Sequence, residues 1–214
     1  LIARSGLRGF IAPGFASSRW YMDSFHELKF NWNEQAGRKA FDEAAKFMAQ
    51  AEAHPSKRLQ GVVYPMQIDT CSEDLLRDCV ALAEETNRPI TTHASQSQVE
   101  FLLMAKRHGV SPIKWASNIG LLGPRTTLGH AIFIDDHPSI DWRAREDLSL
   151  LVDSGTSVAH CPSPFARYGH AMADFGRYHR AGVNLGFGTD GTPHNLIEEM
   201  RLAKIRRASC RERV

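Results

Sequence analysis

Short apolar runs alternate with longer amphipathic stretches along the chain. The apolar runs are rich in β-branched residues and are bounded by Gly or Pro, which is typical of strands buried in a parallel sheet. We predict strands at residues 7–12, 61–65, 89–93, 126–132, 156–160 and 184–189. We predict helices at residues 35–53, 73–87, 97–109, 142–153, 172–181 and 195–204, with a further short helix from residue 112. This unbroken alternation of strand and helix indicates an α/β fold with a parallel sheet.

The stretch 15–33 is rich in aromatic residues and too irregular for a helix. Its aromatic side chains are Phe15, Trp20, Tyr21, Phe25, Phe30 and Trp32. We predict a long loop over one end of the fold. Such a loop could enclose a substrate, or its aromatic side chains could simply pack it onto the fold, and the sequence leaves both interpretations open.

Two helix starts show the spacing of a capping box, in which a Ser or Thr is followed three residues later by Glu. The pairs are Thr70 with Glu73 and Ser97 with Glu100. For Glu100 we favour this capping role over a catalytic role. Pro112 is placed at the first position of the short helix, where its missing N–H costs nothing.

Four predicted strands end in a residue that can bind a metal or carry a proton. These residues are His93, His130, His160 and Asp190. Each could be structural on its own, a His as a hydrogen-bonded core residue and Asp190 as the cap of the next helix. Parallel strands place their carboxyl ends on one rim, so four such residues together indicate a site. Imidazole and carboxylate are the ligands of a catalytic zinc or a similar divalent ion.

Composition limits the class of protein. The chain has 214 residues, 43% of them apolar, which suggests one domain with one sizeable core. A net charge of +2 gives no reason to expect a nucleic-acid partner, and no apolar run is long enough to span a membrane. The four cysteines, Cys71, Cys79, Cys161 and Cys210, include no CxxC pair. Their spacing suggests a reducing, cytoplasmic setting.

Both ends of the chain look artificial. The chain begins without Met, at Leu1, inside a strand-like segment. Residues 207–214 resemble the translation of a sequencing adapter, and we predict that they are a non-native tail. Their three Arg and one Glu account for the whole net charge of +2. We therefore give Cys210 and the basic C-terminus no functional weight.

The four strand ends together resemble a known family. They read Thr92-His93-Ala94-Ser95-Gln96, Leu128-Gly129-His130-Ala131, Ala159-His160-Cys161-Pro162 and Gly188-Thr189-Asp190-Gly191. In this order they resemble the last four strands of the amidohydrolase superfamily, in its cytosine deaminase and triazine hydrolase branch. The resemblance implies that His93 and Asp190 bind a metal and that His130 orients the attacking water or the substrate. It also implies that Asp190 takes the proton of that water and that His160 lines the pocket.

The resemblance also implies what is missing. A (β/α)₈ barrel needs about 250 residues, so residues 1–206 are expected to form an incomplete barrel, strands three to eight. The family's first strand carries a His-x-His pair of metal ligands, which occurs nowhere here. The stretch Gly61–Asp69 contains no Lys to bridge two metals, which favours a single ion. Gln96 stands where deaminases of this branch usually carry a Glu that shuttles protons, and an amide cannot do so.

We therefore expect the whole protein to be a metal-dependent hydrolase with one divalent ion, zinc in preference to iron. Its substrate would be a small polar heterocycle with a non-peptide C–N bond, contacted by Gln67, Gln96 and His160. The fragment itself is expected to be inactive. Three alternatives stay open: a non-catalytic barrel that binds a small molecule, a dechlorinating hydrolase, and an isomerase. Assembly of the whole protein into a homo-oligomer also stays open.

Overall fold

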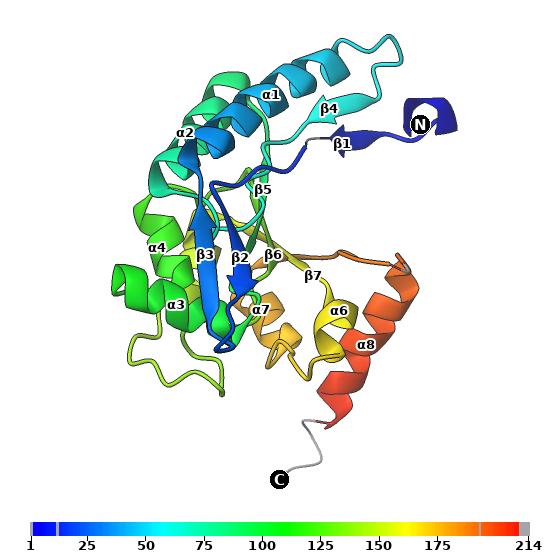
Figure 1. The fold of residues 1–214 in the computed structure, drawn as a ribbon. Helices are drawn as coiled ribbons and strands as arrows, with labels where there is room; N and C mark the ends of the chain where they lie inside the picture. Colours follow the sequence, from blue (N-terminus) through cyan, green and yellow to red (C-terminus); the bar gives the residue numbers. More distant parts are fainter. Residues whose placement is uncertain (1, 12, 193, 210–214) are drawn as a thin grey trace. The chain divides into compact units, whose positions relative to one another are not determined.

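The computed structural model describes residues 2–11, 13–192 and 194–209 (Figure 1). The chain divides into two compact units. The first unit is Leu1–Thr92 with Ile119–Leu121, and the second is His93–Asn118 with Leu122–Val214. Strand β5 (Ile90–Ala94) contributes its first residues to one unit and His93 and Ala94 to the other.

The first unit is built from short strands and two long helices. Its elements are η1 (Ile2–Ser5), β1 (Gly9–Ile11), β2 (Ser18–Met22), β3 (Leu28–Trp32), α1 (Glu34–Glu52), β4 (Leu59–Gly61) and α2 (Glu73–Thr86). Strand β1 pairs in parallel with β4, and Val63 forms a parallel bridge to Ile90. The strand predicted at 61–65 is therefore shorter and earlier, and Pro65, which has no N–H, takes part only in a single bridge to Phe15.

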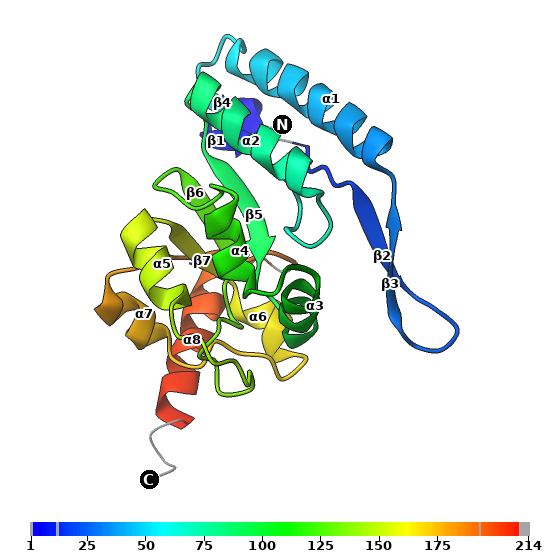
Figure 2. The same ribbon diagram turned by 90° about the vertical axis from the view of Figure 1, so that its left-hand side faces the viewer.

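The predicted loop at 15–33 is wrong, because most of it forms an antiparallel hairpin. Strands β2 and β3 form the hairpin seen in Figure 2. They pair with Trp20 opposite Phe30 and Met22 opposite Leu28, and strand alternation places these apolar side chains on one face. The turn is held by Asp23, whose carboxylate accepts the backbone N–H groups of Phe25 and Glu27. The pairing across the strands gives these aromatic residues partners that their spacing along the chain does not reveal.

Helix α2 also starts differently from the prediction. Its N-cap residue is Ser72, which makes no side-chain cap bond, and the Thr70 hydroxyl donates to the Gln67 carbonyl instead. The predicted capping box of Thr70 and Glu73 is therefore absent. Helix α1 fits its prediction, since Ala44 and Met48 lie on one buried stripe and Asn33 caps the first turn.

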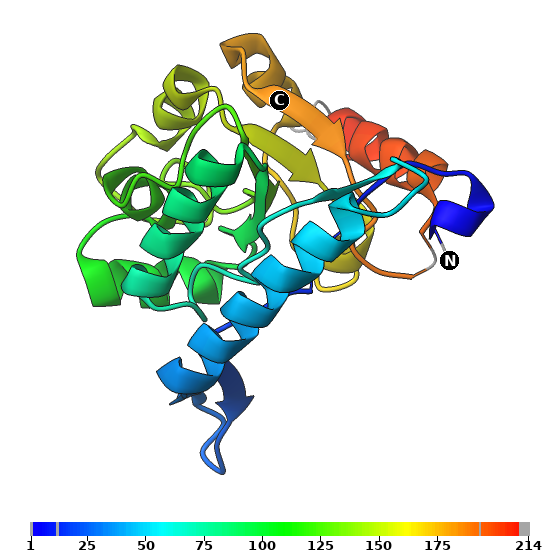
Figure 3. The same cartoon turned by 90° about the horizontal axis from the view of Figure 1, so that it is seen from above.

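The second unit contains the longest sheet. Its remaining elements are α3 (Gln98–His108), α4 (Pro112–Asn118), β6 (Thr126–His130), α5 (Asp147–Ser154), β7 (Ser157–His160), α6 (Pro162–Ala166), α7 (Phe175–Ala181), β8 (Asn184–Phe187) and α8 (Leu196–Ser209). The strand order is β5-β6-β7-β8, and β7 pairs in parallel with both β6 and β8. Figure 3 shows β7 and β8 pointing the same way. The predicted α/β fold with a parallel sheet is confirmed.

Three segments of this unit depart from the predicted elements. The predicted helix 142–153 begins only at Asp147, where the Asp135 carboxylate accepts the N–H groups of Glu146 and Asp147. Helix α7 begins at Phe175, after the capping residue Asp174. The segment after β7, for which we predict no helix, contains the short helix α6.

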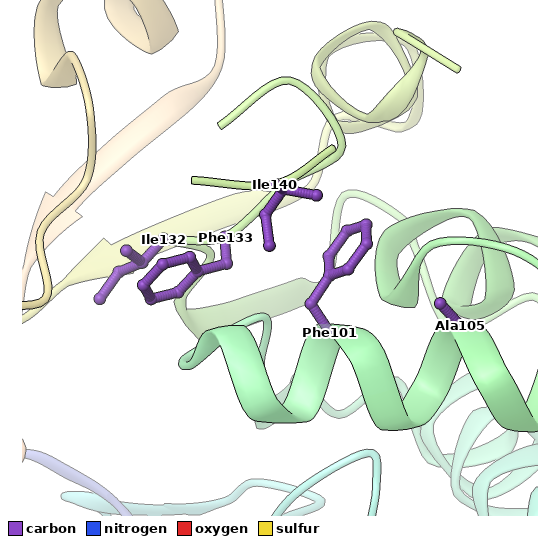
Figure 4. Close-up of a cluster of buried hydrophobic side chains, with 5 residues drawn as sticks. All are labelled: Phe101, Ala105, Ile132, Phe133 and Ile140. Atoms are coloured by element: carbon purple, nitrogen blue, oxygen red, sulfur yellow. The ribbon is translucent and has the colours of Figure 1, made fainter. Parts of the chain in front are cut away.

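A cluster of buried apolar side chains forms part of the core of the second unit (Figure 4). Phe101 and Ala105 of α3 pack against Ile132, Phe133 and Ile140, which follow β6. Full burial of each large apolar side chain stabilises the folded state by about 1.5–3 kcal/mol. The cluster therefore anchors the segments that follow β5 and β6.

Within the described residues, the strands form one four-stranded and two two-stranded sheets, and none of these sheets is a closed barrel. No helix of this part of the chain is long and apolar enough to cross a membrane. The backbone of α8 continues to Ser209. Residues 210–214 of the predicted tail, with Cys210, lie outside the described residues, and the predicted boundary at residue 206 stays a prediction.

Candidate metal centre

Three of the predicted site residues meet in the second unit. His93 lies next to the end of β5, His130 is the last residue of β6, and Asp190 follows β8 by three residues. One donor atom from each lies within 4.8 Å of the donor atoms of the other two. The parallel strands bring these atoms together because their carboxyl ends share one edge of the sheet. We call these three residues the His93–His130–Asp190 cluster.

His93 and Asp190 contact each other directly. The His93 Nε2 and Asp190 Oδ1 atoms are 3.4 Å apart, and both side chains are partly exposed. The hydrogen bond with His93 lowers the pKa of Asp190, and the nearby imidazole rings act in the same direction against partial burial. Asp190 is therefore a carboxylate at neutral pH, ready to bind a cation or accept a proton.

His130 is the buried member of the cluster. Its side chain is 1% exposed, and neither ring nitrogen has a hydrogen-bond partner within the described residues. Burial and the neighbouring His93 lower the pKa of His130 to about 3. The ring is therefore neutral at neutral pH, and a buried polar ring without a partner needs a ligand or water to satisfy it. A neutral imidazole beside a carboxylate and a second imidazole fits a divalent ion such as zinc.

The backbone around the cluster is strained. Ser95, His130 and Asp190 all have positive φ angles, of 54°, 81° and 52°. Residues other than Gly seldom adopt this conformation, and where they do, the strain is often tied to function. These positive φ angles occur just after the ends of β5 and β8 and at the last residue of β6, next to or within the cluster.

The loop after β5 is held by Glu100. Its two carboxylate oxygens accept the backbone N–H groups of Ser95 at 2.7 Å and Gln96 at 2.8 Å, while Ser97 Oγ accepts the Glu100 N–H. The favoured capping role of Glu100 is thus observed, but its carboxylate reaches beyond Ser97 to the two residues before it. Glu100 therefore positions the segment that carries Gln96.

His160 and Gln67 lie outside the cluster. His160 ends β7, is 4% exposed, and its ring lies 5.6 Å from that of Phe175 and 6.4 Å from that of Phe187. Burial lowers the pKa of His160 to about 4. Gln67 belongs to the first unit. The roles of Gln67, Gln96 and His160 as substrate contacts stay predictions.

We expect the stability of this chain to fall as the pH drops from about 6.5 to about 4. Unfolded His binds a proton near pH 6.5, whereas folded His160 does so only near pH 4. Because the unfolded state binds more protons in this window, its free energy drops relative to the folded state as the pH falls. The slope is up to about 1.4 kcal/mol per pH unit for one His. Urea unfolding between pH 7 and 4.5 should show a shallower slope for His160→Phe.

The matched control is His54→Gln, since His54 is exposed. We expect it to keep the slope of the unchanged chain. An identical slope for His160→Phe and the unchanged chain would contradict the prediction and place His160 in a polar, hydrated environment.

Two residues near the site are not predicted from the sequence. Phe165 of α6 packs its ring against His130, with centroids 4.4 Å apart. Glu199 of α8 is buried and binds Ser163 of α6 through both carboxylate oxygens. No strand-end position or motif marked either residue, because both contacts join segments that are distant along the chain.

Comparison with known proteins agrees with this geometry. The model of the amidohydrolase family matches residues 9–212. A 5-methylthioadenosine/S-adenosylhomocysteine deaminase from Thermococcus kodakarensis is 32% identical over 171 residues, which cover 78% of this chain and 38% of the relative. This chain thus spans about two-fifths of the length of the curated relatives that it matches.

Solved structures share the fold. An adenosine deaminase from Xanthomonas campestris with bound zinc has a TM-score of 0.77 at 19% identity, covering 98% of this chain and 44% of its own. A triazine hydrolase from Arthrobacter aurescens has the same TM-score, identity and coverage. The family predicted from the four strand ends is confirmed. With its match over residues 9–212, this chain belongs to the amidohydrolase family.

Proposed function

We propose that this chain is part of a longer, metal-dependent hydrolase that holds one divalent ion and displaces a group from a carbon of a small heterocycle. In this proposal residues 1–206 are strands three to eight of a (β/α)₈ barrel. The observation that carries the proposal is the His93–His130–Asp190 cluster, whose donor atoms lie within 4.8 Å of one another. Residues that serve only the stability of the fold would not be expected to place three donor atoms together and leave a buried imidazole without a hydrogen-bond partner.

In this proposal His93 and Asp190 hold the ion. We assign zinc in preference to iron because the similar adenosine deaminase structure contains bound zinc. A divalent ion bound there would lower the pKa of a water molecule towards about 7. The absence of Lys from Gly61–Asp69 supports a single ion. Two further ligands would come from a His-x-His pair outside this sequence, as the family resemblance implies.

The same residues would handle protons. The Asp190 carboxylate is ionised at neutral pH because His93 lowers its pKa, so it can accept a proton at an oxygen. His130 is neutral, because burial lowers its pKa, so it has one nitrogen that donates and one that accepts. We assign His130 to orienting the attacking water or the substrate, and Asp190 to removing the proton.

For the substrate class we propose an amino-substituted purine nucleoside. The support is the name of the relative from Thermococcus kodakarensis, a 5-methylthioadenosine/S-adenosylhomocysteine deaminase. The bond broken would be a non-peptide C–N bond, with ammonia as the leaving group. Gln67, Gln96 and His160 are the proposed substrate contacts.

The proposed activity is tested with the extended protein, by which we mean this chain together with the sequence that precedes it in its gene. The extended protein, loaded with zinc, is incubated with 5′-methylthioadenosine, adenosine and guanine, and ammonia release is measured. We expect turnover of an adenine nucleoside. Zinc bound without any ammonia release would contradict deamination.

A second candidate is a hydrolase that displaces a halide, and Gln96 is the observation that favours it. An amide cannot carry a proton to a ring nitrogen at neutral pH. Loss of a halide makes a smaller demand on protonation than loss of ammonia. Chloride release from a chlorinated triazine by the extended protein, without ammonia release from nucleosides, would favour this candidate.

We expect Gln96→Glu in the extended protein to change the pH dependence of turnover. The substitution adds a group that ionises at a position close to His93, in the loop that Glu100 holds. A pH–rate profile of kcat/KM should gain one limb, and turnover at neutral pH should change by up to about 10²-fold, the lower end for general acid–base catalysis. Gln98→Glu is the matched control, because Gln98 lies two residues further along and its amide binds the Ser139 carbonyl. Superimposable profiles for all three proteins would show that Gln96 faces away from the chemistry.

A further inference from the structure

The short helix α6 needs support from outside itself. It begins two residues after His160 and has five residues, Pro162–Ala166. A single turn of helix is unstable alone, because its nucleation orders several residues for few hydrogen bonds. Its N-cap residue Cys161 makes no side-chain cap bond. Something beyond the helix must therefore hold it.

Glu199 provides that support. Its side chain lies on α8 and is 2% exposed. One carboxylate oxygen accepts the Ser163 N–H at 2.8 Å, and the other accepts the Ser163 hydroxyl. A carboxylate at the first turn of a helix satisfies free N–H groups and complements the helix dipole. Figure 1 shows α6 beside α8. Glu199 therefore acts as a cap for α6 that comes from another helix.

Helix α6 carries Phe165, and Phe165 contacts His130. The two rings meet edge to face, with centroids 4.4 Å apart and an angle of 63°. Phe165 also packs against the apolar cluster that contains Phe101 and Phe133. Phe165 thus contacts both the core and the imidazole ring.

No hydrogen bond within the described residues orients the His130 ring. A catalytic or metal-bound imidazole usually has its second nitrogen fixed by a carboxylate or carbonyl group. The His130 ring stacks on the His93 ring at 5.1 Å and meets the Phe165 ring edge to face. Of these two, His93 itself belongs to the cluster, so Phe165 is the contact from outside it.

We propose that Phe165 is a positioning residue that fixes the ring orientation of His130, and that Glu199 holds Phe165 in place through Ser163. This inference rests on the proposed function, in which His130 acts on the water or the substrate. It gives helix α6, which follows β7, the role of orienting the His130 ring, whereas His160 at the end of β7 is a proposed substrate contact. It also links the helix that follows Asp190 to the ring of His130.

The test is an NMR experiment on the full 214-residue chain with labelled His and Phe rings, and it needs neither metal nor activity. We expect cross-peaks between the ring protons of His130 and Phe165. In Phe165→Leu and in Glu199→Gln, we expect the His130 ring resonances to shift and, in Glu199→Gln, the cross-peaks to weaken or vanish. Phe165→Tyr keeps the aromatic edge, so we expect it to restore the His130 resonances nearly to their original positions.

A matched control separates this role of Glu199 from a general effect of changing a carboxylate on α8. Glu198→Gln alters the neighbouring, half-exposed carboxylate, which forms an ion pair with Arg201. It should leave the His130 resonances unchanged. If Glu199→Gln does not fold, Ser163→Ala removes only the hydroxyl contact and is expected to produce a smaller shift of the same kind.

Absent cross-peaks in the unchanged chain would overturn the inference, as would equal shifts of the His130 resonances in Glu198→Gln and Glu199→Gln. The result is independent of the proposed function. If the cross-peaks are present but the extended protein neither binds zinc nor turns over substrate, the positioning of His130 stands and the proposed function fails. If the protein is active and the cross-peaks are absent, only the positioning inference fails.

Discussion

Replacing Asp190 with Asn in the extended protein is expected to lower kcat by about 10²–10⁴-fold, the range for loss of a general base. In our proposal Asp190 both binds the ion and accepts a proton, and the amide of Asn performs neither role well. An amide oxygen is a weaker ligand for a divalent ion than a carboxylate, and it cannot accept a proton at neutral pH. Since His93 lowers the pKa of Asp190, the lost group is one that is ionised in the folded protein. The measurement is kcat and bound zinc for both proteins.

The matched control for this substitution is Asp153→Asn. Asp153 is an exposed residue of α5, so its substitution should leave both zinc content and kcat unchanged. An Asp190→Asn protein that keeps its zinc and more than about a tenth of its activity would remove Asp190 from the chemistry. Asp190 would then be only a hydrogen-bond partner of His93.

The 214-residue chain by itself is expected to bind zinc weakly and to show no turnover. A catalytic zinc site normally has three protein ligands beside its water. In our assignment this chain supplies two of them, His93 and Asp190, because His130 is placed on the water or the substrate. The measurement is zinc content after dialysis. We expect on the order of one ion per molecule in the extended protein and only a small fraction of that in the 214-residue chain.

Two substitutions in the extended protein sharpen this prediction. His93→Ala should release the zinc, whereas His160→Ala should retain it, because His160 lies outside the His93–His130–Asp190 cluster. Near-stoichiometric zinc in the 214-residue chain, with measurable turnover, would show that His130 is a ligand and that the site needs no residues from outside this sequence.

The sequence by itself determined the fold class, the family and the place of the cluster. Strands alternate with helices, and His93, His130 and Asp190 each stand at or just after a strand end. Those features are local, so spacing and residue type along the chain reveal them. Parallel pairing then brings the carboxyl ends together at one edge, a general property of such sheets that needs no knowledge of particular contacts.

Local patterns did not reveal where helices α5 and α7 begin or how the aromatic residues of 15–33 are arranged. The hairpin of β2 and β3 depends on which residues face each other across two strands, and Trp20 opposite Phe30 cannot be read from spacing alone. The start of α5 depends on Asp135, a residue eleven positions before Glu146. Such contacts override local propensity because a buried N–H must find an acceptor wherever one is available.

Only the tertiary structure decided what surrounds the cluster. Glu100 reaches back to Ser95 and Gln96, and Glu199 reaches across to Ser163. Phe165 meets His130 only because α6 is held against its neighbours. The His and Asp residues at strand ends can be recognised from the sequence, because their residue type and their position after an apolar run are local features. The residues that hold them are set by side-chain packing between distant segments, and such packing leaves no periodic pattern along the chain.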